Sequence, residues 1–273
     1  RSTLFPYTTL FRSGSCVTPL VARLLVQRDI TEPEAARRFL YPETEQRYYD
    51  PFLLQDMDKA VVRIEKAVAE GETIIVYGDY DVDGITSASL LVRTLRRLDA
   101  KASYYIPTRQ EGYGLHEETL RRLVKEGVSL VVSVDCGISA VAEVEALQGA
   151  LDIVITDHHL PGPILPPAVA VVNPHRAEET YPFPDLAGVG VAWKLCQALW
   201  KKLRGEDFSE DLELAALGTV ADMVPLLGEN RKLVREGLRR FASISLIGLA
   251  ELIRVSGLED QTVTQLPDRK SVV

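Results

Sequence analysis

The pattern of apolar and polar positions changes character twice along the chain. From residue 17 to about 55 it indicates short helices broken by prolines. Residues 56–71 then place apolar side chains three and four positions apart and end at Gly71, which predicts an amphipathic helix with a glycine at its end. We therefore expect the N-terminal stretch to be helical.

From residue 72 onward, short apolar runs alternate with helical patterns. The predicted strands are 73–78, 102–107, 129–135, 152–157 and 168–174, and the predicted helices between them are 85–98, 116–127 and 139–149. Strands flanked by helices are typical of a parallel sheet covered on both faces, and right-handed crossovers then give a doubly wound α/β domain. After residue 185 the pattern is helical, over 185–203, 209–224, 229–242 and 246–257.

These patterns divide the chain into five predicted parts. Residues 1–13 are interpreted as a non-native tail, because the chain begins with Arg1 and repeats "TLF", and residues 258–273 as a truncated linker or second non-native tail. Between them we expect a helical segment at 14–71, an α/β core at 72–185 and a helical part of the same domain at 186–257. The chain is thus expected to be a fragment.

Composition narrows the class of protein. A net charge of −8 and a pI of about 5.2 argue against coating duplex DNA by bulk electrostatics, although a local basic groove remains possible. No apolar run approaches the ~20 residues of a membrane span, and no signal-peptide pattern is found, so we expect a cytoplasmic protein without membrane contact. Cys16, Cys136 and Cys196 form no CxxC pair and are interpreted as small apolar core residues.

Three aspartates follow the first predicted strand, in the stretch "TIIVYGDYDVDGITS". If the strand geometry continued, Asp79, Asp81 and Asp83 would project to one side. At roughly 4 to 6 Å, each pair of such charges repels by about 1 to 4 kcal/mol, which a divalent cation would neutralise.

Two simpler interpretations of these aspartates were weighed. A strand followed by aspartates and glycine is often only a turn. The stretch also matches the start of a D-x-D-x-D-G calcium loop, but position twelve of that loop requires Glu and is Leu90 here. The loop should also follow a helix, whereas this stretch follows a strand pattern.

Polar side chains follow the other predicted strands as well, and the carboxyl ends of parallel strands share one edge of a sheet. In chain order these candidates are Arg109 and Gly112, Asp135, Asp157, His158 and His159, and Asn173, His175 and Arg176. Many carboxylates with one or two imidazoles suit Mg²⁺ or Mn²⁺ rather than zinc, and so many acids suggest two ions. Arg109, beside the glycines of "EGYG", is a candidate for holding a phosphate, and Arg176 is a weaker one.

The motifs "GDYDVDG", "SVDCGIS", "TDHH" and "GTVADMVPL" resemble the four motifs of the DHH phosphoesterase superfamily. Within it, "YIPTRQEGYGL", "VVNPHR" and "LAGVGVAWKL" are similar to the RecJ family of single-strand-specific 5′→3′ exonucleases, over about residues 17–257. The resemblance implies hydrolysis of phosphodiester bonds in single-stranded DNA with a free 5′ end, in repair and recombination, with two Mn²⁺ or Mg²⁺ ions activating a water.

The resemblance also implies roles for individual residues. The implied metal ligands are Asp81, Asp83, Asp135, His158 and Asp222, with Asp135 between the two ions. Asp79 would either bind a metal as well or support a neighbouring ligand. His159 would contact the scissile phosphate and Asp157 would hold the imidazoles, so the implied catalytic set is His159, Asp157, Asp81 and Asp135. From the strand-end positions, we predict the substrate-binding set Arg109, Gly112, Asn173, His175 and Arg176.

Alternatives remain at this point. Other members of the superfamily cleave pyrophosphate, oligoribonucleotides or cyclic dinucleotides, but they lack the N-terminal helical segment and "LAGVGVAWKL". A related replication scaffold would have lost the ligands that are present here. No "GGH" motif of the second, DHH-associated domain occurs, so an inactive fragment is a further alternative. "GVGVAW" lacks the third glycine of a dinucleotide fingerprint and is interpreted as a turn before a helix. The oligomeric state is open, with a monomer expected.

Overall fold

Prolines mark the starts of the short N-terminal helices. The computed structural model describes residues 17–45, 47–241 and 244–257, so Cys16 and the predicted tails at 1–13 and 258–273 lie outside the described residues. Helices α2 (Pro19–Val26), α3 (Pro33–Leu40) and α4 (Pro42–Glu45) and the 3-10 helix η1 (Pro51–Leu53) each begin at a proline. Proline fits there because an N–H in the first turn has no helical partner.

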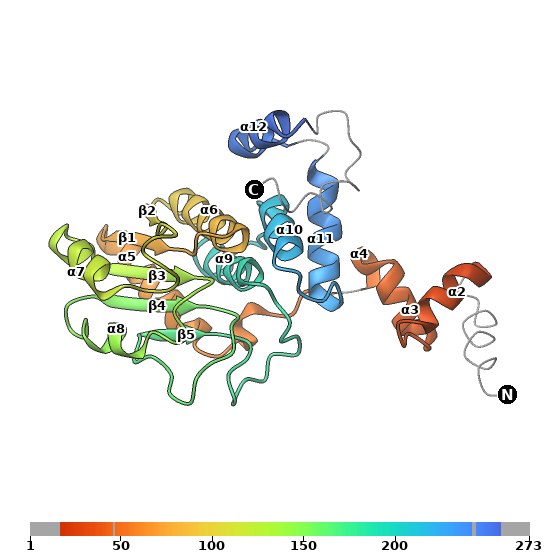
Figure 1. Cartoon of the computed structure of the whole chain (residues 1–273), viewed down its shortest axis with the longest axis horizontal. Helices are drawn as coiled ribbons and strands as arrows, with labels where there is room; N and C mark the ends of the chain where they lie inside the picture. The colour runs from red at the N-terminus through yellow and green to blue at the C-terminus, as the bar shows by residue number, and fades with distance from the viewer. Residues whose placement is uncertain (1–16, 46, 242–243, 258–273) are drawn as a thin grey trace.

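A five-stranded parallel sheet forms the centre of the structure, with strand order β2-β1-β3-β4-β5 (Figure 1). Its strands are β1 (Thr73–Tyr77), β2 (Lys101–Tyr105), β3 (Leu130–Val134), β4 (Asp152–Thr156) and β5 (Ala170–Val172). All neighbouring strands pair in parallel. The predicted doubly wound α/β fold is therefore confirmed, although β5 is shorter than the expected 168–174.

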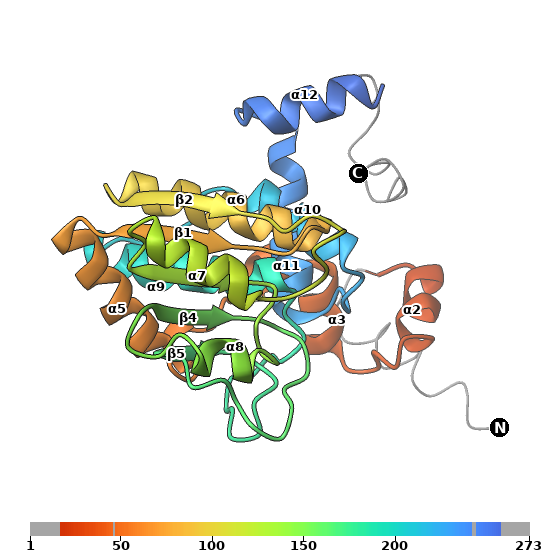
Figure 2. The same cartoon turned by 60° about the vertical axis from the view of Figure 1, so that its left-hand side comes forward.

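Alternate residues of each strand enter two separate cores. Ile74 and Val76 pack with α5 (Met57–Glu70), α6 (Val82–Arg97) and α9 (Gly188–Arg204) on one face. Ile75 and Tyr77 pack with α7 (Glu117–Lys125) and α8 (Val141–Glu145) on the other face (Figure 2). This alternation follows from the period of two along a strand, and it explains why β1 and β3 are mostly apolar on both faces.

Within the described residues, three further helices follow α9. They are α10 (Leu212–Ala221), α11 (Gly228–Arg240) and α12 (Ile247–Val255), and α10 packs against both α6 and α11. The predicted helix at 209–224 is shorter in the structure, and Asp222 lies at the C-terminal end of α10. No helix within the described ranges is both long enough and apolar enough to span a bilayer.

A buried ion pair joins α9 to α11 and to the N-terminal segment. Lys194 Nζ lies 2.6 Å from Glu229 Oε1 and donates to the backbone oxygen of Tyr49 at 2.9 Å, while the side chains of Lys194 and Glu229 are 1% and 0% exposed. Glu229 also accepts the Tyr49 N–H and the Tyr181 hydroxyl. Burial lowers the pKa of Lys194, and the facing Glu229 opposes this shift. These contacts satisfy charges that would be costly to bury alone.

We predict that Glu229→Ala destabilises the fold by about 3–5 kcal/mol, because it leaves the Lys194 ammonium buried without a counter-charge. Arg121→Ala is the control, since the Arg121–Glu117 pair is about half exposed and should contribute only about 0–1 kcal/mol. Urea unfolding followed by circular dichroism measures both variants. Equal stabilities for the two variants would contradict the proposed importance of the buried pair.

Candidate metal centre

The strand order creates an opening at the carboxyl edge of the sheet, between β1 and β3. The chain leaves β1 toward β2 on one side and later enters β3 on the other, so these two strands are neighbours in space but not in sequence. Such a switch point is where ligands bind in open α/β sheets. Asp79, Asp81 and Asp83 follow β1 at this point, and Asp135 follows β3.

The predicted alternation of the three aspartates along a strand is wrong. Strand β1 ends at Tyr77, and the Asp81 carboxylate caps α6 by accepting the Gly84 N–H at 2.9 Å. Asp83 lies in the first turn of α6. The turn is tight because a Cβ on Gly84 would lie 2.5 Å from the backbone oxygen of Asp79. The three carboxylates are thus brought together by a turn and a helix start, with different directions.

The N-terminus of α9 holds Asp83. The Gly188 N–H donates to Asp83 Oδ2 at 2.7 Å and the Val189 N–H donates to Asp83 Oδ1 at 2.8 Å. These are free N–H groups of a helix start, where the helix dipole also favours a negative charge. The turn predicted for "GVGVAW" is therefore the start of a helix that positions a carboxylate, a role the sequence reasoning missed.

Asp135 lies between the start of α9 and His158. Its backbone has φ 59°, a left-handed conformation that is unusual for a residue other than glycine, and its side chain is 2% exposed. A Cβ on Gly188 would lie 2.4 Å from Asp135 Oδ1, so only glycine lets α9 approach this closely. The strained residue is thus fixed by the packing of α9 against it.

His158 joins Asp135 to the two remaining predicted ligands. Its Nε2 atom lies 3.2 Å from Asp135 Oδ1, 3.9 Å from Asp83 Oδ2 and 3.8 Å from Asp222 Oδ2. Asp222 comes from the end of α10, far from the other residues in sequence. The structure therefore brings together every residue that the sequence analysis predicted as a metal ligand.

Ligand atoms within 4.8 Å of one another form three overlapping groups of described residues. They are Asp79, Asp81 and Asp135; Asp83, His158 and Asp222; and Asp135, His158 and His159. Asp79 Oδ1, Asp135 Oδ1 and His158 Nε2 are buried and have no hydrogen-bond partner among the described residues. Buried acceptors without donors are costly, and carboxylates with one imidazole suit Mn²⁺ or Mg²⁺. The donor set therefore fits divalent cations.

The charges at this site oppose one another when no cation is bound. Burial and the nearby Asp135 raise the pKa of Asp83 well above its ordinary value. Burial and then Asp81 and Asp157 do the same for the pKa of Asp135. Burial also raises the pKa of Asp79. All three shifts mean that the ionised carboxylates gain from a cation.

Asp157 organises the loop that carries both histidines. Its fully buried carboxylate accepts the N–H groups of Ile138, His158 and His159, and lies 2.7 Å from His159 Nδ1. Burial alone would raise the pKa of Asp157, but these hydrogen bonds lower it below the ordinary value. The contact with Asp157 raises the pKa of His159 to about 9. The contact thus favours the protonated imidazole and places Nδ1, rather than Nε2, against Asp157.

Tyr113 contacts this pair, although the sequence reasoning did not select it. Its hydroxyl lies 3.1 Å from His159 Nδ1 and donates to the backbone oxygen of Asp135 at 3.3 Å. The signal was present in "EGYG", where Gly112 and Gly114 flank the tyrosine with φ values of 91° and 97°. Two left-handed glycines allow a sharp turn that presents the side chain between them.

The predicted substrate-binding residues separate into two groups. Arg109 is exposed beside the aspartates, with its guanidinium carbon 5.2 Å from the ring centre of Tyr80, and Gly112 lies in the same loop. Asn173 is buried and instead supports the histidine loop, donating to the backbone oxygen of His159 at 2.9 Å. His175 Nδ1 lies 2.6 Å from the backbone oxygen of His158. These two contacts favour a structural role over substrate binding.

The contacts of Arg176 argue against its predicted role. Its guanidinium donates to Asp56, to Glu178 and to the backbone oxygen of Val171, and its side chain is only 10% exposed. A guanidinium occupied in this way joins β5 to the start of α5 and does not face the site. The sequence placed Arg176 after a strand correctly, but it could not show these acidic partners.

Comparisons with known proteins agree with the geometry. The profile of the DHH family, N-terminal domain, matches residues 73–219. The RecJ exonuclease of Bacillus subtilis is 48% identical over 88% of this chain, which spans 30% of that protein. A Thermus thermophilus RecJ structure in complex with Mn²⁺ is 31% identical, with a TM-score of 0.77 over 97% of this chain and 37% of its own. Its Mg²⁺ complex is 26% identical, with a TM-score of 0.66 over 97% and 34%.

We predict that Gly188→Ala weakens Mn²⁺ binding by about 10- to 100-fold, because the new Cβ would displace the Asp135 carboxylate. Gly190→Ala is the matched control on the same helix, where the Cβ would meet only the flexible side chain of Leu186 at 3.2 Å. Isothermal titration calorimetry measures both affinities, with circular dichroism to verify folding. Unchanged Mn²⁺ affinity in folded Gly188→Ala would contradict this packing argument.

Stability without metal should depend on pH through Asp135. Its pKa is raised in the folded state above the ordinary value of 3.8, so its favourable contribution is complete below that pH and is lost as the pH rises. In excess chelator we expect Asp135→Asn to gain thermal stability relative to the wild type as the pH rises from about 4 to about 7. Differential scanning fluorimetry measures this difference, with the exposed Asp207→Asn as the control. A difference that stays constant with pH would overturn the prediction.

Proposed function

The chain belongs to the DHH family, and we propose that it carries the catalytic centre of a single-strand-specific 5′→3′ DNA exonuclease. The observation that supports this best is the pair of ligand groups, one of Asp79, Asp81 and Asp135 and one of Asp83, His158 and Asp222, in a chain 48% identical to a RecJ exonuclease. The chain spans only 30% of the length of that Bacillus subtilis protein. We therefore propose the exonuclease activity for the longer protein.

Two divalent ions would be held by the two ligand groups, with Asp135 between them. Asp135 supports this role because its carboxylate belongs to one group and lies 3.2 Å from His158 of the other. Bound Mn²⁺ or Mg²⁺ supplies a more acidic water and stabilises negative charge on a phosphodiester. The chain would hold these ions partly through buried carboxylates, since Asp83 and Asp135 are almost fully buried.

His159 would contact the scissile phosphate, and Asp157 would orient His159 for that contact. Asp157 holds His159 Nδ1, so the Nε2 atom of the half-exposed imidazolium is available to a phosphate oxygen. A positioned cation of this kind stabilises the charge that develops during phosphoryl transfer. Asp157 itself is fully buried and contacts only protein groups, so its role is to orient His159.

Arg109 would guide the DNA backbone toward this centre. Its guanidinium lies against the ring of Tyr80, between Asp79 and Asp81 in sequence, and Arg side chains suit bidentate contacts with phosphate. An exposed cation at the rim offsets the repulsion between acidic ligands and a polyanion. For the longer protein we propose a free 5′ end as the substrate determinant, a monomeric state, and a cytoplasmic role in repair and recombination.

The small-substrate alternative is less well supported. The N-terminal helices, α9 and the residues of "LAGVGVAWKL" form integral parts of this structure, and Gly188 of that segment holds a predicted ligand. An inactive fragment remains the second outcome to distinguish. It would bind metal at the same residues but release no nucleotides.

We predict that the chain releases nucleotides from 5′-phosphorylated single-stranded DNA with Mn²⁺ or Mg²⁺ and that EDTA abolishes this release. The Asp81→Ala, Asp83→Ala double variant should lose activity by at least about 10³-fold, because each ligand group then lacks a carboxylate. Asp207→Ala, on the exposed surface, is the control.

Metal binding separates the outcomes of this experiment. If calorimetry finds Mn²⁺ binding that the double variant abolishes, but no nucleotide is released, the site is intact and the fragment lacks its substrate contacts. Unchanged Mn²⁺ binding in the double variant would contradict the site assignment. Release of phosphate from pyrophosphate, with no action on DNA, would favour the small-substrate alternative.

A further inference from the structure

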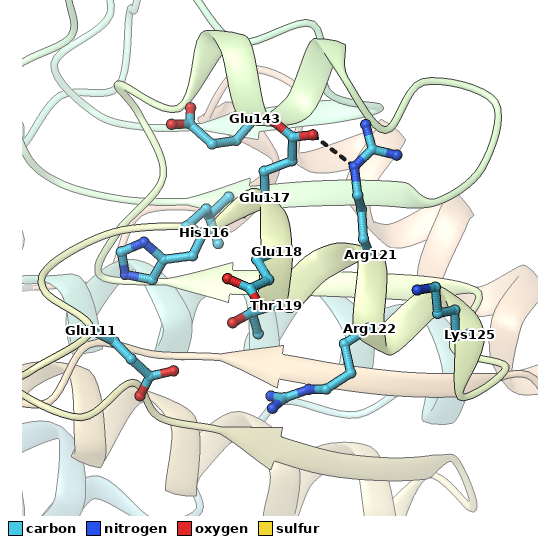
Figure 3. Close-up of a pocket in the computed structure, with 10 residues that line it drawn as sticks. Glu111, His116, Glu117, Glu118, Thr119, Arg121, Arg122, Lys125 and Glu143 are labelled. Carbon is cyan, nitrogen blue, oxygen red and sulfur yellow. Dashed lines mark hydrogen bonds and ion pairs between the residues drawn. The ribbon is translucent and has the colours of Figure 1, made fainter.

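The loop between β2 and α7 is fixed at both of its ends. The Glu111 carboxylate accepts the N–H of Thr108 at 2.7 Å and the Thr108 hydroxyl at 2.8 Å, and it also accepts the Tyr105 hydroxyl. His116 Nε2 lies 3.2 Å from the backbone oxygen of Gly112. Figure 3 shows Glu111 and His116 at one end of a hollow of about 970 Å³ along α7. Tyr113 lies between these two anchors.

The hydrogen bonds of the Tyr113 hydroxyl, more than burial of its ring, hold this side chain in place. The side chain is 44% exposed, so burial of the ring provides only part of the usual stabilisation. The hydroxyl nevertheless has two partners, Asp135 O at 3.3 Å and His159 Nδ1 at 3.1 Å. Its proton goes to the carbonyl oxygen of Asp135, because a carbonyl can only accept. The phenol oxygen is then an acceptor for the proton on His159 Nδ1.

A single hydrogen bond leaves an exposed imidazole free to tilt about that bond. His159 is 47% exposed and is bonded through Nδ1 to Asp157. The Tyr113 oxygen lies within hydrogen-bond distance of the same nitrogen, and the two rings meet edge to face with centres 5.6 Å apart at 69°. The His158 ring also lies against His159, with centres 4.5 Å apart. Two acceptors at Nδ1 and these ring contacts fix both the proton position and the ring plane.

We propose that Tyr113 is a positioning residue that orients His159 for the reaction. The inference rests on the proposed function, since it assigns His159 Nε2 to the phosphate and Nδ1 to the protein. Tyr113 shares the Nδ1 proton with Asp157 and thereby directs Nε2 toward the substrate. Because Tyr113 also bonds the backbone of Asp135, one hydroxyl couples the imidazole to a predicted metal ligand. Gly112 and Gly114 are needed to present this side chain.

Nuclear magnetic resonance of the histidine rings tests the contact without requiring activity. The chain contains four histidines, so a sample labelled with ¹⁵N-histidine gives few signals, and His159→Gln assigns those of His159. Tyr113→Phe keeps the ring and removes the hydroxyl, and we expect it to shift the His159 Nδ1 and Nε2 resonances. Tyr104→Phe, a 62% exposed tyrosine on β2, should leave them unchanged. Identical His159 signals in Tyr113→Phe and the wild type would overturn the proposal.

A kinetic double-mutant cycle tests the role in the reaction. Tyr113→Phe should lower kcat on single-stranded DNA by about two- to tenfold and leave KM and Mn²⁺ affinity unchanged. In a His159→Ala background, Tyr113→Phe should have no further effect, because its influence passes through His159. An equal loss in both backgrounds would show that Tyr113 acts independently, contrary to the proposal. If the wild-type chain releases no nucleotides, the Mn²⁺-binding measurement described above decides the proposed site, and the resonance measurement decides the Tyr113–His159 contact.

Discussion

The close approach of the buried carboxylates Asp83 and Asp135 to a single imidazole, His158, is the constraint on which the rest of the site depends. Like charges at such distances repel by about 1 to 4 kcal/mol per pair, and burial adds several kcal/mol for each charge. The N-terminus of α9, which donates two N–H groups to Asp83, stabilises the ionised carboxylate by about 0.3–2 kcal/mol. The protein groups alone therefore do not balance the ionised carboxylates, which gain stability by taking up a proton or by binding a cation. The raised pKa values of Asp83 and Asp135 express the same imbalance.

This requirement explains why helices from the C-terminal part of the chain belong to the site. Helix α9 must approach Asp83 and Asp135 closely enough to donate its first N–H groups, and Gly188 makes the approach possible. Gly218 does the same for α10, because a Cβ there would lie 2.3 Å from Thr86 Oγ1 and 2.9 Å from Asp83 Oδ1. Further along α9, the buried pair of Lys194 with Glu229 fixes the helix against α11. The candidate metal centre thus depends on the close packing of α9 and α10 against the same carboxylates.

The fold was predictable because period-two apolar runs and helical patterns report directly on burial, and the gathering of strand-end residues follows from parallel topology. The direction of the Asp83 side chain was not predictable, because a tight turn depends on close contacts such as that between Gly84 and the backbone of Asp79. Asp222 lies at a helix end with no local signal, and only its motif indicated a role. The contact of Arg176 with Asp56 and the contact of Tyr113 with His159 had no sequence signal, because these partners are distant in sequence. Sequence patterns indicate which residues gather, whereas their mutual orientation requires the three-dimensional packing.

Exposure increases in a regular order from the floor of the site to its rim. Asp83 and Asp135 are 1% and 2% exposed, His158 and Asp222 are 11% and 22% exposed, and His159 is 47% exposed. Arg109 is exposed beyond them. Asp81 is exposed at the same edge, so acidic and basic side chains face solvent together there. An exposed guanidinium beside buried carboxylates lets a chain with a net charge of −8 offer a local favourable contact to an anion without a basic surface overall.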